Sequence, residues 1–334
     1  MKIAIVKLSS LGDVIHALPV AHALRRHFPT AHVSWIVEAR ESEVLKGHPD
    51  LDSVIPVDTR RWRRLLWSFQ GAREVRGKLS RLARRVRDIR FDVAIDLQGL
   101  MKSGFLAAYT GAPVRIGFAW RRCREPLSAL LTNRRVAPPA SAIHVVDQYL
   151  SLLEPLGVQD RRAVFRLPAC PDAERTIEEF LTEQGVKSSD RLVALNPGAG
   201  RPRKRWPFSH YRSLAERLTV EAGVRVLLLW GPDELAMAQA ISRGATARPI
   251  MAPPTGLLQL AALLRRCDLV IAGDTGPLHL AAALETPVLG LYGPTRSERN
   301  GPYGPRCRAV QSPDGRMATI RADDVFQAAV ELLE

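Results

Sequence analysis

The sequence predicts an α/β fold of two domains, each built on a parallel sheet. Short apolar runs of strand length alternate with helical patterns from end to end, and this alternation starts again near the middle of the chain. The length of 334 residues suits two domains of about 150 residues each. Open parallel sheets bind ligands outside the carboxyl ends of their strands, so we expect the two domains to face each other across a shared cleft.

The first half contains apolar runs that we interpret as strands, separated by patterns with helical periodicity. The predicted strands are Ile3–Val6, Val33–Val37, Val54–Val57, Val93–Asp96 and Val114–Gly117. The predicted helices are Val14–His27, Arg73–Arg87, Met101–Thr110 and Val145–Leu156.

A linker is predicted at Gln159–Pro171, where charged residues and prolines replace the periodic pattern. We therefore divide the chain into an N-terminal domain, 1–165, and a C-terminal domain, 166–334. The second domain has predicted strands at Leu192–Leu195, Val226–Leu229, Leu269–Ala272 and Val288–Leu291. Its predicted helices are Ala173–Gln184, Tyr211–Glu221, Leu235–Ser242, Leu257–Arg266 and Leu278–Leu284.

The composition predicts a soluble globular protein with an anionic partner. Lys and Arg number 48 against 34 acidic residues, a formal charge of +14, which fits nucleic acid, a phospholipid surface or a phosphorylated substrate. The 4 cysteines are scattered and form no CxxC pair, so neither a zinc site nor a disulfide framework is expected. The N-terminus does not resemble a signal peptide, and no apolar run has transmembrane length. We expect a cytoplasmic protein whose membrane contact, if any, is peripheral.

The first strand-to-helix turn, Lys7–Asp13, has the small residues and free N–H groups that let an anionic ligand approach. The turn is not GxGxxG, so the sequence gives no support for a nicotinamide cofactor. Asp13 has two interpretations. It either caps the helix and interacts favourably with its dipole, or it serves as a general base at the edge of the cleft.

The second sheet opens with a glycine-containing loop, Asn196–Gly200, followed by the basic segment Arg201–Pro207. Four cations beside such a loop suit a departing diphosphate, although a solvated basic loop is an equal alternative. The P-loop signature GK[ST] is absent.

Two further loops follow predicted strands of the second sheet. In Ala272–His279, Asp274 and Thr275 stand where a helix cap is expected, whereas His279 falls on an apolar helix face typical of core histidines. In Trp230–Glu234, the acidic side chain of Glu234 could reach a ribose. Three such loops on one sheet indicate a nucleotide site better than any one alone.

Basic residues also gather in the first half, at Arg60–Arg64 and at Arg121–Arg124. Charge runs are usually solvated surface, but arginine forks also match phosphate and carboxylate oxygens. We place Arg60–Arg64 in a loop after a strand, where Trp62 suits a membrane interface.

Taken together, these motifs resemble the lipopolysaccharide heptosyltransferases of glycosyltransferase family 9, and among them the type I enzymes most closely. The similarity extends from Met1 to about the last helix. Its most specific segments are Lys7–His16, Arg60–Arg63, Asp96–Ser103, Arg124–Leu127 and Asp274–His279. The resemblance implies the GT-B architecture of two facing Rossmann-like domains, with the last helix returning to the first. It also implies a metal-independent enzyme that inverts the anomeric centre of its donor.

The resemblance also implies the roles of individual residues. Asp13 would be the general base, and Lys204 would contact the phosphates. The nucleotide-sugar, ADP-heptose, would be bound by Ser10, Gly12, Gly198, Ala199, Gly200, Glu234, Asp274, Thr275, Gly276 and His279. The anionic lipid A–Kdo acceptor would be bound by Arg60, Arg61, Arg64 and Arg124. No cofactor or metal, no nucleic acid and a monomeric state are expected, with the enzyme on the cytoplasmic face of the inner membrane.

One segment departs from the type I pattern. The loop Asn196–Gly200 is closer to type II enzymes, so transfer of a second heptose stays an alternative, as does another nucleotide-sugar. A nucleic-acid-binding protein would also explain the positive charge. Aromatic residues are only 6% of the chain, however, and no RNP1-like strand or zinc-finger spacing is present.

Overall fold

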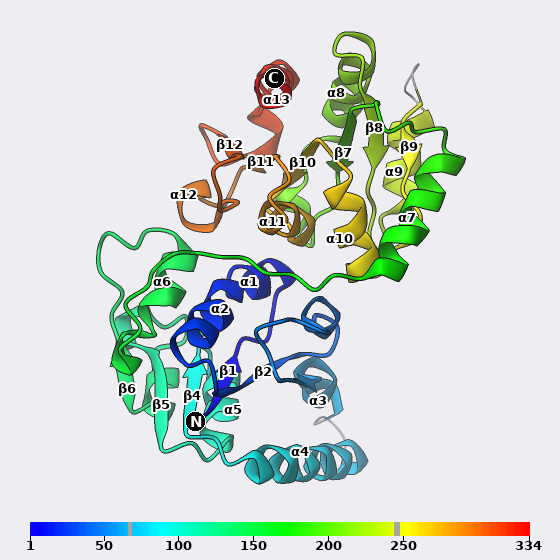
Figure 1. Ribbon diagram of the computed structural model, residues 1–334. Helices are drawn as coiled ribbons and strands as arrows, with labels where there is room; N and C mark the ends of the chain where they lie inside the picture. The colour runs from blue at the N-terminus through cyan, green and yellow to red at the C-terminus, as the bar shows by residue number, and fades with distance from the viewer. Residues whose placement is uncertain (66–68, 244–247) are drawn as a thin grey trace. The chain divides into compact units, whose positions relative to one another are not determined.

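The computed structural model describes residues 1–65, 69–243 and 248–334; for part of 63–85, Arg64 included, it describes the backbone only. The chain forms two compact α/β units, Met1–Pro168 and Ala169–Glu334 (Figure 1). Their boundary falls inside the segment Gln159–Pro171, in which the sequence predicts a linker. We describe each unit by itself.

The first unit is built on six parallel strands in the order β3-β2-β1-β4-β5-β6, an arrangement typical of Rossmann folds. Central β1 pairs with β2 and with β4, so that Ile5 lies between Trp35 and Ile95. The strands are β1 Lys2–Val6, β2 His32–Glu38, β3 Ser53–Val57, β4 Val93–Asp96, β5 Val114–Phe118 and β6 Arg134–Val136.

Helices cover the sheet of the first unit. Buried residues of α4 and α5, among them Val86 and Leu106, share one core with Val6 and Ala94 of the sheet. Helix α6 packs against α2. The helices are α1 Leu11–Ile15, α2 Leu18–His27, α3 Thr59–Leu65, α4 Phe69–Ile89, α5 Met101–Tyr109 and α6 Val145–Ser151, with 3₁₀ helices η1 Ser42–Leu45, η2 Trp120–Arg122, η3 Pro126–Leu131 and η4 Glu154–Leu156.

Two predictions for these helices are wrong in detail. The predicted helix Val14–His27 is divided into α1 and α2, because Pro19 lies in the first turn of α2 and cannot donate a backbone hydrogen bond to a preceding turn. The segment Arg60–Arg64 is not a loop but part of α3. Trp62 on this helix is partly buried and packs against the core of the first unit.

The second unit repeats the topology of the first. Its parallel sheet has the order β12-β11-β10-β7-β8-β9, which is the same arrangement with the strands renumbered. The strands are β7 Leu192–Asn196, β8 Arg225–Leu228, β9 Ile250–Met251, β10 Leu269–Gly273, β11 Val288–Tyr292 and β12 Cys307–Gln311. The helices are α7 Pro171–Glu183, α8 Phe208–Val220, α9 Leu235–Arg243, α10 Leu257–Arg265, α11 Gly276–Ala283, α12 Ser297–Asn300 and α13 Ala322–Leu333, with 3₁₀ helices η5 Pro202–Lys204 and η6 Met317–Thr319.

The last helix, α13, falls within the second unit. It packs against α8 and buries Val325 and Phe326 in the core of that unit. On α8, Arg217 stacks over the Phe326 ring at 3.9 Å and pairs with Asp323 at 2.9 Å. These contacts bury part of the apolar face of α13 and pair an acidic residue of its first turn with a cation.

Three strands of the structure have no counterpart among the predicted ones: β6, β9 and β12. All three lie at sheet edges, where one side of the strand has no neighbour. Their residues are partly exposed, and β12 contains no buried residue at all. Such strands need no continuous apolar run, so the pattern that identifies central strands is lacking.

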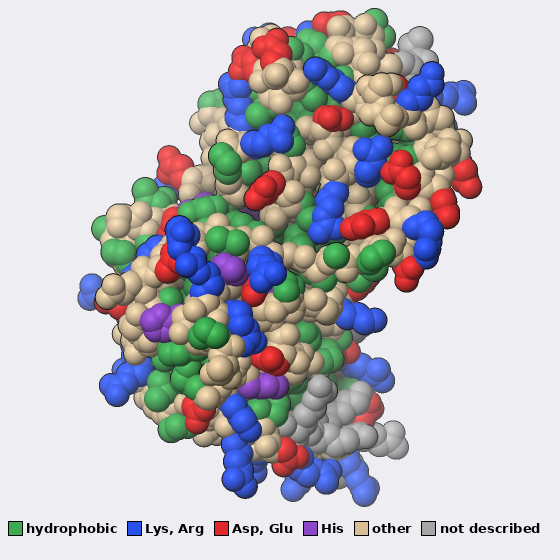
Figure 2. Space-filling view, viewed as in Figure 1, with side chains coloured by type: hydrophobic (Ala, Val, Ile, Leu, Met, Phe, Trp, Pro, Cys, Tyr) green, Lys and Arg blue, Asp and Glu red, His purple; other side chains and the backbone are tan. Residues whose placement is uncertain are grey.

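The positive charge is spread over both units. On the face drawn in Figure 2, Lys and Arg side chains stand among acidic ones and do not form a single continuous track. The charge excess therefore does not by itself mark a binding surface on this face.

Candidate functional site

Asp13 lies in the short helix α1, directly after β1. Its Oδ2 atom accepts hydrogen bonds from the backbone N–H of Ser10 at 3.0 Å and from the Ser10 hydroxyl at 2.9 Å. These bonds close the first turn of α1, as the capping interpretation requires. The other oxygen, Oδ1, faces Lys7, and one third of the side chain is exposed (33%). Asp13 therefore caps the helix and still presents a carboxylate that a substrate could reach.

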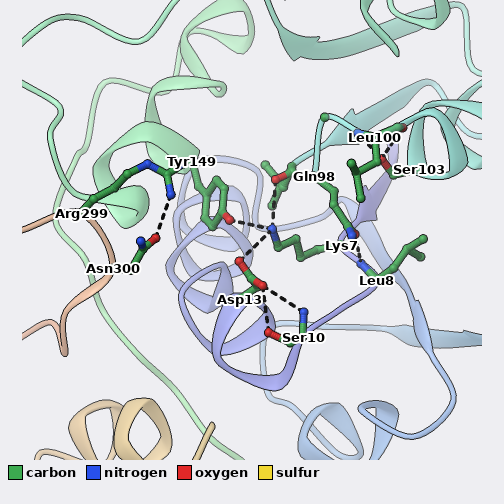
Figure 3. Close-up of polar contacts among 12 residues, drawn as sticks. Lys7, Leu8, Ser10, Asp13, Gln98, Leu100, Ser103, Tyr149, Arg299 and Asn300 are labelled. Carbon is green, nitrogen blue, oxygen red and sulfur yellow. Dashed lines mark hydrogen bonds and ion pairs between the residues drawn. The ribbon is translucent and has the colours of Figure 1, made fainter. Parts of the chain in front are cut away.

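Lys7 is a buried cation at the carboxyl end of β1 (Figure 3). Its Nζ donates to the Tyr149 hydroxyl at 2.6 Å and to the Leu97 carbonyl at 3.3 Å, and it lies 3.7 Å from Asp13 Oδ1. Tyr149 comes from α6, Leu97 from the loop after β4 and Asp13 from α1, so three separate segments hold the ammonium group in place.

The ionisation of Asp13 is set by this cation. Burial raises the pKa of Asp13, but the charge on Lys7 and the hydrogen bonds from Ser10 outweigh it and lower the pKa below its usual value. Burial likewise lowers the pKa of Lys7, whereas Tyr149 and Asp13 raise it, with a net increase. At neutral pH the structure therefore holds a carboxylate next to an ammonium group.

The neighbouring loop after β4 is organised by Asp96 and Gln98. Asp96 Oδ1 accepts the backbone N–H of Gln98 at 2.9 Å, and Gln98 Oε1 accepts the backbone N–H of Leu8 at 2.8 Å. Burial raises the pKa of Asp96 to about 6. The first turn and the β4 loop are thus tied together. No role for Lys7, Asp96 or Tyr149 is predicted from the sequence. For Lys7 and Asp96 the signal is a polar residue at the end of an otherwise apolar run, whereas Tyr149 lies in α6 and has no such signal.

Arg124, a predicted acceptor residue, lies in an exposed loop beside this assembly. Gly99, with φ +64°, lies close to this loop, since a Cβ there would lie 3.3 Å from the Cα of Cys123. The Glu125 N–H donates to the Gly99 carbonyl at 3.0 Å. The charge of Arg124 also contributes to lowering the pKa of Asp13. The structure therefore brings Arg124 and Asp13 into one electrostatic environment.

The other predicted acceptor residues lie on α3. Thr59 begins this helix and donates its backbone N–H to the buried Glu38 at 3.2 Å. Arg60 and Arg61 follow with exposed side chains, and Arg61 pairs with Glu74 of α4 at 3.6 Å. The side chain of Arg64 lies outside the described part of the chain.

In the second unit, Lys204, Asp274 and His279 form one cluster. The Lys204 Nζ lies 2.5 Å from Asp274 Oδ2, and the His279 Nε2 lies 3.2 Å from Asp274 Oδ1. Burial raises the pKa of Asp274, but His279 and Lys204 lower it well below its usual range. His279 is buried, as its apolar neighbours predicted, and it contacts the acid that the sequence placed in the same loop.

The glycine loop and the β8 loop are packed together in the same unit. A methyl group on Gly198 would overlap the carboxylate of Glu234, so a larger residue at this position would displace that side chain. Glu234 Oε2 accepts the backbone N–H of Gly231 at 3.0 Å. Ala199 is buried and its carbonyl accepts from Arg205 at 3.1 Å, whereas Gly200 is exposed.

The β10 loop joins this group through Asn196. Its side-chain amide donates to the Thr275 hydroxyl at 3.0 Å, and Thr275 precedes Gly276, the first residue of α11. The donor-binding residues predicted in the second unit therefore lie on the three loops that follow the carboxyl ends of β7, β8 and β10. Ser10 and Gly12, also predicted to bind the donor, lie in the first unit beside Asp13, and Gly12 is buried.

Within residues 1–65, 69–243 and 248–334, no three His, Cys, Asp or Glu side chains are grouped so that they could hold an ion. Asp274 is already engaged by Lys204 and His279.

Solved structures and sequence relatives resemble this chain along its length. The structure described as E. coli heptosyltransferase WaaC with ADP matches with a TM-score of 0.82 and 29% identity, covering 99% of this chain and 100% of that one. A protein named lipopolysaccharide heptosyltransferase 1 from Pseudomonas aeruginosa is 35% identical over 91% of this chain and 82% of its own length. Its namesake from Salmonella typhimurium is 31% identical over 98% of this chain and 99% of its own length.

The family itself is identified by its sequence profile. The profile of glycosyltransferase family 9 (heptosyltransferase) matches residues 79–329, which span most of the chain and the candidate residues of the second unit. The fold, the residues gathered at the carboxyl ends of the two sheets and these similarities all indicate the same family. The chain belongs to glycosyltransferase family 9, the heptosyltransferases.

Proposed function

We propose that this protein transfers a heptose from ADP-heptose to a Kdo residue of a lipid A–Kdo acceptor, with inversion at the anomeric carbon. The observation that carries the proposal is the ionised carboxylate of Asp13, which is partly exposed and held by Lys7 and Ser10 at the carboxyl end of the first sheet. The relatives named lipopolysaccharide heptosyltransferase 1 support the choice of donor sugar and acceptor.

The reaction is a single displacement. An oxygen of Asp13 takes the proton from the acceptor hydroxyl. At the same time the hydroxyl oxygen bonds to the anomeric carbon, and the bond between that carbon and the ADP oxygen breaks. Because the pKa of Asp13 is low, the proton moves as the new C–O bond forms and the hydroxyl becomes acidic. No covalent enzyme intermediate is needed, so a second catalytic carboxylate is not required.

The departing ADP gains negative charge, which the second unit would stabilise. Lys204 is partly exposed and its partner Asp274 is an anion, so a diphosphate could take the place of that carboxylate next to the ammonium group. The N–H groups of the Gly198–Gly200 loop and the start of α11 at Gly276 suit phosphate oxygens. Glu234 would bind the ribose.

The first unit would bind the acceptor through Arg60, Arg61, Arg64 and Arg124, whose guanidinium groups match phosphate and carboxylate oxygens. Among the residues that the structure describes, no helix is both long and apolar enough to cross a bilayer. Because the proposed acceptor carries lipid, we propose that the protein works peripherally on the cytoplasmic face of the inner membrane. We also propose that it is a monomer.

Acceptor choice is the finer part of the proposal. A lipopolysaccharide heptosyltransferase 2 from E. coli is 27% identical, below the type 1 relatives, which favours transfer of the first heptose. The test is transfer from ADP-heptose to Kdo-bearing lipid A, with an already heptosylated acceptor run alongside. Product on the heptosylated acceptor alone would assign the type II reaction, and product on neither would reject the proposal.

A further inference from the structure

The first unit carries a group of large apolar side chains that its own fold does not cover. Phe105 on α5 is 58% exposed, and on η3 Leu127 is 55% and Leu130 is 64% exposed. Tyr109 follows Phe105 by one helical turn and is also exposed. We call these four residues the apolar face.

These side chains belong to one surface because α5 and η3 are packed together. The two segments are in close contact at Gly104, where a Cβ would lie 2.9 Å from the Leu131 side chain. Leu106 and Ala107 on the opposite side of α5 are buried in the core. Phe105 and Tyr109 are therefore left facing outward beside η3.

Positive charges border the apolar face. The Arg87 guanidinium lies 5.9 Å from the centre of the Tyr109 ring, and Arg135 donates to the Ala129 carbonyl of η3 at 2.8 Å. The neighbouring helix η2 adds exposed Arg121 and Arg122. It also carries Trp120, which is half exposed and has the amphipathic ring favoured at lipid headgroups.

We propose that the apolar face is the surface by which this protein lies on an anionic lipid bilayer. Exposed aromatic and leucine side chains enter the boundary between headgroups and acyl chains, while surrounding arginines pair with anionic headgroups. A second copy of the chain fits less well, because a symmetric contact through this surface would bring the same arginines opposite each other.

The position of this surface suits the reaction, a point that depends on the proposed function. Leu127 follows Arg124 closely in the chain, and α5 begins directly after the Gly99 loop that contacts the Arg124 segment. An acceptor whose acyl chains stay in the bilayer would thus present its charged headgroup next to Arg124. The lipid-binding step itself requires no heptose transfer.

The test measures binding of the full chain to vesicles of phosphatidylethanolamine and phosphatidylglycerol, with phosphatidylcholine vesicles for comparison. We expect Phe105→Ser combined with Leu130→Ser to weaken binding to the anionic vesicles about tenfold or more, because two apolar side chains no longer enter the lipid. Phe208→Ser is the matched control, since Phe208 in the second unit is similarly exposed (53%), and it should bind as the unaltered chain does.

A second pair of substitutions tests the charge separately. Arg121→Gln with Arg122→Gln should reduce the preference for anionic over neutral vesicles and make binding less sensitive to salt. Circular dichroism confirms that each variant is folded. Equal vesicle binding by the Phe105/Leu130 variant and the unaltered chain would overturn the proposal, as would a dimer that dissociates only in that variant.

Activity separates this inference from the proposed function. With a deacylated, water-soluble acceptor, the Phe105/Leu130 variant should turn over at the rate of the unaltered chain, whereas transfer to vesicle-embedded acceptor should fall. Loss of vesicle binding without any heptose transfer by any form would support the surface and reject the enzyme activity. Transfer to both acceptors with unchanged binding would do the reverse.

Discussion

The two units share one strand order, and each places a lysine beside an aspartate at the carboxyl ends of its central strands, yet the two pairs differ. In the first unit, Lys7 is almost fully buried (2% exposed) and 3.7 Å from Asp13, with Tyr149 and Leu97 as further partners. In the second, Lys204 is one-fifth exposed (20%) and lies 2.5 Å from Asp274.

The difference shows how one pair of residue types can serve two purposes. Lys7 is fixed on several sides, so its charge acts on Asp13 as a constant field that keeps the acid ionised. Lys204 lies on a short 3₁₀ turn at the surface, where Asp274 holds it within reach of an incoming anion. In the proposed reaction the first pair prepares a base, and the second prepares a cation.

The largest effect is expected from removing the base of the first pair. Asp13→Ala should lower kcat by about 10²- to 10⁴-fold, because the acceptor hydroxyl loses its proton acceptor. Lost capping should reduce the free energy of unfolding by about 1 kcal/mol. Asp13→Asn separates the two roles, since an amide oxygen can still accept from Ser10 but is no base. If the Asn variant turns over normally, Asp13 is a cap and the comparison fails.

Next in size is removal of the exposed cation. Lys204→Ala should lower kcat by about 10²-fold, the loss typical of one group that stabilises developing charge, with less effect on acceptor KM. Steady-state kinetics with both substrates measure this. Arg203 and Arg205 flank Lys204 and could partly replace it. The triple Arg203, Lys204, Arg205→Ala variant is therefore the stricter test, and normal turnover by it would rule out a phosphate-binding role for this segment.

The contrast between the pairs also explains what the sequence could and could not reveal about the site. Asp13, Lys204 and Asp274 belong to the connections that follow predicted strands, where a short motif is enough to single them out. The contact between Lys7 and Tyr149 joins residues 142 positions apart, so no local pattern encodes it. Lys7 also follows directly after the apolar run of β1. Its burial beside Asp13, which the sequence does not show, is what indicates that its charge acts on that carboxylate.

The central strands of both sheets could be predicted from the sequence, whereas several edge strands could not. Central strands such as β1 and β7 are buried over most of their length and therefore form short apolar runs in the sequence. Edge strands such as β12 are partly exposed and lack that run. The packing of α13 against α8 was also not predictable, because the apolar pattern of a helix does not tell which element covers it.

A sharper test of the fixed cation is the pH dependence. Asp13 must be ionised to act as a base, so kcat/KM falls as the pH drops through its pKa. The charge on Lys7 opposes the effect of burial and lowers that pKa. Lys7→Met removes the charge, so the pKa should rise and the acidic limb should move to higher pH. Lys7→Arg retains the charge and should leave the limb near its original position, whereas an unmoved limb in Lys7→Met would contradict the tuning role.

A smaller effect is expected from the arginines of the first unit. Arg61→Glu with Arg64→Glu should raise the acceptor KM about tenfold at low salt. Added salt should reduce this difference, since interactions between exposed charges are screened over a Debye length of about 8 Å at physiological ionic strength. ADP binding should be unchanged because Lys204 and Asp274 belong to the second unit. Calorimetry with ADP decides this. A large loss of ADP affinity with unaltered acceptor KM would show that the two units have the opposite roles.

The smallest effect, none, is expected from chelation. If Lys204 supplies the positive charge at the departing diphosphate, no divalent cation is needed there. A cation bound to Asp274 would have to displace Lys204 from Oδ2 or His279 from Oδ1, and the low pKa of Asp274 reflects how strongly both groups already stabilise its charge. Dialysed enzyme should therefore have the same turnover with and without EDTA. Activity that disappears with EDTA and returns with magnesium would mean that Asp274 holds a metal during the reaction, and Lys204 would then not be the cation of the second pair.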